Sequence, residues 1–74
     1  MRTQADVEGL IRLLFQEIGA DPSDLIQIRP FDGGWADALS YGVTRRDGKH
    51  TKIYRRDLDD GNEQGMKAAL RSFV

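Results

Sequence analysis

The chain has 74 residues, of which 39% are hydrophobic and 31% are charged, with one histidine, no cysteine and a formal net charge of −1. A chain this short holds one core, so we expect a single domain over residues 1–74. It can form no disulfide, one histidine cannot build a zinc site, and no apolar run approaches the about 20 residues of a membrane span. Because no secretory signal follows Met1, we expect a cytoplasmic protein, without a cofactor. The chain starts at Met1 and its last predicted helix uses the final residues, so we expect a whole gene product.

Residues 3–18 predict an amphipathic helix. Its apolar residues recur at helical spacing and share one stripe: Val7, Leu10, Ile11, Leu14, Phe15 and Ile18. Thr3 is the predicted N-cap, and Asp6 suits the positive end of the helix. Gly19 stands where a helix commonly ends in a left-handed residue. Leu13 lies outside the stripe, so we expect it to be partly exposed.

A capped turn and a strand are predicted next. Residues 21–24 favour a turn or one short helical turn. Residues 25–29 are β-rich and predict a strand in which Ile26 and Ile28 point the same way. Pro30 is expected to end this ladder, at a strand end or on an edge strand, because it has no N–H to donate.

Two aromatic residues, Phe31 and Trp35, flank a predicted turn that begins at Asp32. Aromatic residues beside an acidic turn either close the end of a small core or anchor an interface. These two, with Asp32 and Asp37, therefore form a secondary candidate interface.

Residues 36–46 and 49–56 predict a β-hairpin. Leu39, Tyr41 and Val43 alternate with small or polar residues, so we expect these three to face the core. A face opposite the core would then carry small, basic and aromatic side chains: Ser40, Gly42, Thr44, Arg46, His50, Lys52, Tyr54 and Arg56.

The hairpin register depends on the loop length. A two-residue loop would place Ile53 on the polar face. A three-residue loop, with Gly48 in the left-handed bulge position, instead pairs Val43 with Thr51 and Tyr41 with Ile53. We prefer the second register because it keeps the apolar residues together.

A second helix is predicted from about residue 60 to residue 73. Asp60 and Glu63 are similar to a capping box, and Met66, Leu70 and Phe73 fall on one face. The element order is then α-β-β-β-α. Because each helix has one apolar stripe, we expect an α+β fold with both helices packed on one face of a three-stranded antiparallel sheet.

The net charge conceals an uneven distribution. Residues 44–56 carry six basic and one acidic side chain, or +5, so the remaining five basic and eleven acidic side chains sum to −6. Residues 17–37 alone sum to −4. A basic segment attracts phosphate or carboxylate groups. The candidate partner-binding residues are Arg45, Arg46, Lys49, His50, Lys52, Tyr54 and Arg56.

The residues that invite a metal or catalytic interpretation do not support one. An EF-hand loop beginning at Asp57 would need Gly at its sixth position and Glu at its twelfth, where the chain has Asn62 and Ala68. In the preferred register His50 faces Thr44 rather than a carboxylate, so a catalytic dyad lacks support. We expect neither a metal site nor enzymatic activity.

The predicted element order is shared with double-stranded-RNA-binding domains. Those domains resemble one another in a lysine-rich start to the last helix. Here the corresponding residues 59–63 are acidic and would repel a phosphate, so we do not assign the chain to that family.

The sequence favours a small protein that binds rather than catalyses. The leading hypothesis is a protein-interaction module, a stand-alone adaptor or inhibitor, that binds a protein partner through the basic hairpin face, the acidic surface or both. Its size and composition are similar to those of inhibitors encoded by mobile elements, such as anti-CRISPR proteins, by analogy only. The alternative is nucleic-acid binding, with Tyr54 stacking on a base and nearby basic side chains neutralising phosphates. A homodimer is a third arrangement, and we expect no membrane contact.

Overall fold

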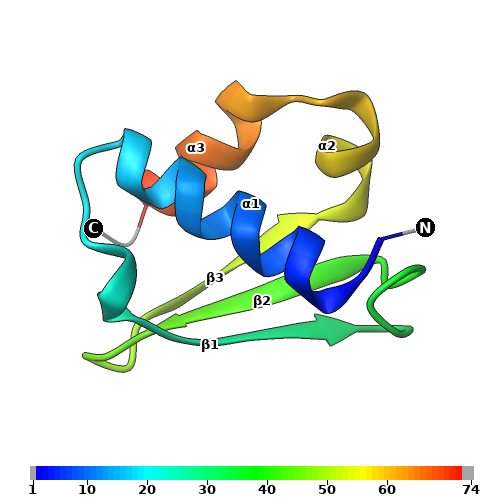
Figure 1. The fold of residues 1–74 in the computed structure, drawn as a ribbon, viewed down its shortest axis with the longest axis horizontal. Helices are drawn as coiled ribbons and strands as arrows, with labels where there is room; N and C mark the ends of the chain where they lie inside the picture. The colour runs from blue at the N-terminus through cyan, green and yellow to red at the C-terminus, as the bar shows by residue number, and fades with distance from the viewer. Residues whose placement is uncertain (1, 73–74) are drawn as a thin grey trace.

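The chain folds into a layer of helices on one face of a three-stranded antiparallel sheet of order β1-β2-β3 (Figure 1). The computed structural model describes residues 2–72. The elements in chain order are α1 (Gln4–Glu17), the 3₁₀ turn η1 (Pro22–Asp24), β1 (Leu25–Phe31), β2 (Ser40–Arg45), β3 (His50–Tyr54), α2 (Arg55–Asp60) and α3 (Glu63–Arg71). Helices α1 and α3 lie over the sheet in Figure 1, which confirms the expected α+β arrangement.

Helix α1 forms as its sequence predicts. The Thr3 hydroxyl accepts a hydrogen bond from the Asp6 N–H (3.2 Å), and the Asp6 carboxylate accepts one from the Thr3 N–H (3.1 Å), which completes a capping box. Gly19 follows the helix with φ of +90°. Four stripe residues are fully buried: Val7, Ile11, Leu14 and Phe15. Leu13 is 52% exposed, as expected.

The predicted turn is confirmed, because Asp21 caps η1 by accepting a hydrogen bond from the Ser23 N–H (2.9 Å). This bond lowers the pKa of the Asp21 carboxyl below its ordinary value.

Strand β1 departs from its prediction at two positions. Leu25 pairs with Arg45 and Gln27 with Thr44, so Ile26 is the extra residue of a β-bulge. The bulge leaves Ile26 58% exposed while Ile28 is 5% exposed, so the prediction that the two point the same way is wrong. The strand also continues through Pro30 rather than ending there. The alternative expectation for Pro30, an edge strand, is confirmed, because β1 lies at the edge of the sheet, where a missing N–H is tolerated.

The preferred hairpin register is confirmed. Val43 pairs with Thr51 and Tyr41 pairs with Ile53. The Arg45 N–H donates to the Lys49 carbonyl (2.8 Å), and Gly48 has φ of +90°, as a three-residue loop with a bulge requires.

Leu39 does not face the core. It precedes the first residue of β2 and is 54% exposed, so that prediction is wrong. The neighbouring Ala38 is buried in its place. The strand alternation therefore begins at Ser40, one residue later than the pattern suggested.

The predicted C-terminal helix is α3, which begins three residues later than expected, and a short helix that was not predicted, α2, precedes it. Gly61, with φ of +64°, ends α2, and Asn62 begins α3 by accepting a hydrogen bond from the Gly65 N–H (3.1 Å). The predicted capping pair of Asp60 and Glu63 is therefore wrong, because the left-handed glycine separates Asp60 from α3. Phe73 lies outside the described residues.

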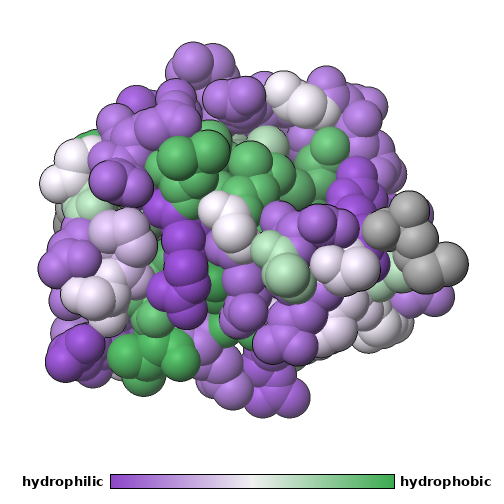
Figure 2. All heavy atoms as spheres, in the orientation of Figure 1, coloured by the Kyte–Doolittle hydropathy of each residue, from purple (hydrophilic) through white to green (hydrophobic). Residues whose placement is uncertain are grey.

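The core lies between the sheet and the helix layer, and Tyr41 is at its centre with no exposed surface. The Tyr41 hydroxyl donates to the Trp35 carbonyl (2.5 Å), and the two rings stack with centroids 6.0 Å apart. Burial raises the pKa of Tyr41 above the ordinary 10.0. On the outside of the molecule, Figure 2 shows an apolar band across the helix layer, surrounded by hydrophilic residues.

Candidate functional site

The sheet face opposite the helices is the candidate site, and we call it the open face. The pairing register aligns its residues in three rows across β1, β2 and β3. The rows are Gln27, Thr44 and His50; Arg29, Gly42 and Lys52; and Phe31, Ser40 and Tyr54.

An aromatic ring lies at the centre of the open face. A Cβ added to Gly42 would stand only 2.3 Å from Phe31 Cε2, so the ring occupies the space directly above Gly42. Arg29 Cζ lies 5.5 Å and Lys52 Nζ 5.8 Å from the centroid of the Phe31 ring, close enough for cation–π attraction. Phe31 is still 38% exposed, so one aromatic ring and two cations are presented together.

The open face combines basic and aromatic side chains with no acidic side chain. None of its nine residues is Asp or Glu. A hollow of about 270 Å³ crosses it and is lined by Gln27, Arg29, Phe31, Gly42, Thr44, His50, Thr51 and Lys52. Because cations line this hollow without compensating acids, its field favours a partner that carries carboxylates or phosphates.

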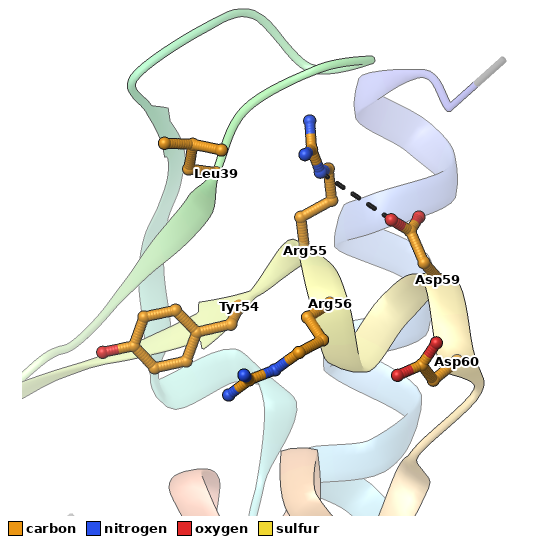
Figure 3. Close-up of a pocket in the computed structure, with 6 residues that line it drawn as sticks. All are labelled: Leu39, Tyr54, Arg55, Arg56, Asp59 and Asp60. Atoms are coloured by element: carbon orange, nitrogen blue, oxygen red, sulfur yellow. Dashed lines mark ion pairs between the residues drawn. The ribbon is translucent and has the colours of Figure 1, made fainter.

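A second hollow, of about 460 Å³, lies where β3 passes into α2 (Figure 3). Leu39 and Tyr54, which are 54% and 52% exposed, form its apolar part. Arg55 turns toward Asp59, with their charged atoms 3.7 Å apart, whereas Arg56 turns the other way, to the side of Tyr54 (Figure 3). This hollow adjoins the open face at Tyr54, and Asp59 and Asp60 form its acidic part.

The predicted partner-binding residues do not form one surface. His50, Lys52 and Tyr54 lie together on the open face. Lys49 is exposed in the hairpin turn, and Arg45 approaches Asp47 there (3.9 Å).

Arg46 was expected on the open face, and this is wrong. Its guanidinium donates to the Ser23 carbonyl (2.9 Å) and lies 4.0 Å from the Asp24 carboxylate, while its N–H donates to the Asp24 carbonyl (2.8 Å). Arg46 therefore links the hairpin turn to η1, where the Ser23 and Asp24 carbonyls accept its hydrogen bonds.

Arg56 was also expected on that face, and this too is wrong, because β3 ends at Tyr54 and Arg56 belongs to α2. It is exposed and borders the second hollow.

The secondary candidate residues divide between the surface and the interior. Phe31 lies on the open face, whereas Trp35 packs against the core. Asp37 closes the loop by accepting a hydrogen bond from the Gly34 N–H (2.7 Å), and its carbonyl accepts one from Arg55 (3.1 Å). Asp32 is exposed, with φ of +57°. The four residues therefore do not form a single interface.

Sequence reasoning missed the contribution of β1 to the open face. Gln27, Arg29 and Phe31 alternate with Ile28 and Pro30, and this alternation was the available signal. The alternation was hidden because Ile26, the first isoleucine of the strand, is the bulged residue and is out of phase with the residues that follow.

No family model matches this chain, and searches of curated proteins and of solved structures find no similar protein. Within residues 2–72, no group of three or more His, Asp or Glu side chains is placed to hold a metal ion. No helix in this part of the chain has the length and apolar character needed to cross a membrane.

Proposed function

We propose that this protein is a non-enzymatic interaction module, an adaptor or inhibitor, whose open face binds an acidic surface of a partner protein. The observation that carries the proposal is the grouping of Phe31, Arg29 and Lys52 on a face that has no acidic residue. Aromatic and arginine side chains dominate binding energy at protein interfaces, and complementary charge accelerates and orients association.

The charge pairing within the fold favours a protein partner over nucleic acid. Three cations in or next to the hairpin already face acidic side chains of this chain: Arg45 faces Asp47, Arg46 faces Asp24, and Arg55, the first residue of α2, faces Asp59. Affinity for nucleic acid rises with the number of phosphates neutralised, and the open face itself offers two cations, Arg29 and Lys52. Two cations beside exposed aromatic rings suit a few carboxylates next to apolar groups better than a continuous phosphate backbone.

Partner capture with two charge-matched variants tests this proposal. Lys52→Glu reverses a charge on the open face, and Arg71→Glu makes the same change at an exposed site at the end of α3. We expect Lys52→Glu to abolish recovery of the partner and Arg71→Glu to preserve it. Equal recovery by the two variants would show that the open face is not the interface. Steeply salt-dependent binding of oligonucleotides by the wild type would support the nucleic-acid alternative instead.

A further inference from the structure

The edge of β3 that faces away from β2 carries backbone N–H groups that have no backbone hydrogen-bond partner among residues 2–72. At its two ends, the Arg45 N–H donates to the Lys49 carbonyl (2.8 Å) and the Arg55 N–H to the Leu39 carbonyl (3.0 Å). Bonded residues alternate along an antiparallel ladder, so Lys49, Thr51, Ile53 and Arg55 direct their backbone groups toward β2. Of the residues between them, His50 and Lys52 direct both backbone groups outward, and Tyr54 directs its N–H outward, whereas the Tyr54 carbonyl belongs to the N-cap of α2 and faces that helix. No backbone carbonyl within residues 2–72 accepts a hydrogen bond from the outward N–H of these three residues.

The other edge strand of the sheet, β1, is poorly suited to pairing with an additional strand. Pro30 has no N–H, and the bulge at Ile26 interrupts the regular ladder of β1. Both features are usual ways of preventing strand addition. Of the two sheet edges, β3 therefore offers the regular row of donors and acceptors.

We infer that the β3 edge accepts an extended acidic segment of the partner protein as an additional antiparallel strand. This inference rests on the proposed function and specifies how the open face engages its partner. In such an addition, main-chain hydrogen bonds supply affinity and alternate side chains supply specificity.

The charge on β3 selects the occupant. Lys52 is the middle residue of the strand and of its three outward-directed positions. A second copy pairing about Lys52 would place two lysines directly opposite each other, which is destabilising. An acidic residue at that position would instead form a cross-strand ion pair. Lys52 therefore disfavours self-pairing while favouring an acidic strand.

The geometry specifies which residues of the incoming strand bear the charge. A residue opposite Lys52 in a hydrogen-bonded pair exchanges both backbone bonds with it, and the two side chains project from the same face. The acidic residues of the partner segment are therefore the ones whose N–H groups bond to β3. Their side chains lie over the open face beside His50, Lys52 and Tyr54.

A capped (Glu-Thr)₃ hexapeptide tests this arrangement by NMR and amide hydrogen exchange with the wild-type protein. Two modified peptides give a matched comparison: N-methylation of the glutamates removes donors that face β3, and N-methylation of the threonines removes donors that face away. We expect the unmodified and Thr-methylated peptides to slow exchange of the Lys52 amide about tenfold at millimolar concentration. We expect the Glu-methylated peptide to bind about tenfold more weakly.

Strand addition at β3 and binding of an acidic partner by the open face are contradicted by different results. Binding of all three peptides to the open face with no protection of the Lys52 amide would overturn strand addition and leave the proposed function intact. Failure of all three acidic peptides to bind, together with binding of the control (Lys-Thr)₃ or of oligodeoxythymidine, would overturn both.

Discussion

Phe31 lies directly on Gly42, across the boundary between β1 and β2. The space that a Cβ would occupy at position 42 is filled by the edge of the Phe31 ring, 2.3 Å from Cε2. Arg29 and Lys52 flank the same ring. A glycine in the middle strand thus sets the position of the aromatic ring and of its two cations on the open face.

Gly42→Ala should move Phe31 without unfolding the protein. The displaced atom belongs to a half-exposed side chain, so we expect a change of less than about 1 kcal/mol in the free energy of unfolding. The Phe31 ring resonances should shift, and partner binding should weaken. The control is Gly9→Ala, where a Cβ meets nothing within 4 Å. This helix substitution should stabilise the fold by about 0.5–1 kcal/mol and leave binding unchanged.

Ile53 and Tyr54 are neighbours on opposite faces of β3, with exposed fractions of 1% and 52%. Ile53→Asp leaves an unpaired carboxylate in the core, which costs about 3 kcal/mol or more beyond the lost apolar burial. We expect this variant to be unfolded by circular dichroism. Tyr54→Asp should remain folded, because position 54 is the N-cap of α2, where Asp is favourable. A folded Ile53→Asp variant would contradict the register.

The start of α3 is tested by a pair of substitutions. Asn62→Ala removes the hydrogen bond to the Gly65 N–H and should cost about 1 kcal/mol of stability in a urea titration. Asp60→Ala, in the last turn of α2, should change stability by less than about 0.5 kcal/mol. A larger loss of stability in Asp60→Ala than in Asn62→Ala would instead identify Asp60 as the N-cap of α3.

Tyr41 should make the protein unstable in alkali. Because its pKa is raised in the folded state, the unfolded chain releases the phenol proton first, at a pH near 10.0. The stability that Tyr41 contributes is therefore complete below about pH 10 and is lost as the pH rises through the raised pKa. Tyr41→Phe removes the hydrogen bond to the Trp35 carbonyl and should lower the free energy of unfolding by about 1 kcal/mol at neutral pH. The free energy of unfolding of this variant should also decline less steeply at alkaline pH. Parallel declines in the two proteins would contradict this assignment.

The elements that the sequence predicted well depend on local signals. The capping box at Thr3 and the glycine at position 48 are encoded within a few residues, and they determine the start of α1 and the register of the hairpin. Helix α2 was missed because residues 55–60 are short and contain a single apolar residue, Leu58, which produces no helical stripe.

The open face was predicted only in part, because half of it depends on tertiary pairing. His50, Lys52 and Tyr54 follow from the hairpin register alone. Arg29 and Phe31 reach the same face through the pairing of β1, and the bulge at Ile26 hid the alternation that would have placed them there. Arg46 is absent from it because it hydrogen-bonds to Ser23 and Asp24, which lie more than 20 residues away in the chain.

Calorimetry tests most directly whether the open face binds an acidic partner. It would measure the affinity of the captured partner for the wild type, Lys52→Glu and Arg71→Glu at two salt concentrations. We predict that Lys52→Glu weakens binding about tenfold or more, and that Arg71→Glu changes it less than about twofold. We also predict that added salt weakens wild-type binding. Equal affinities for the two variants would contradict the claim that the open face binds an acidic partner.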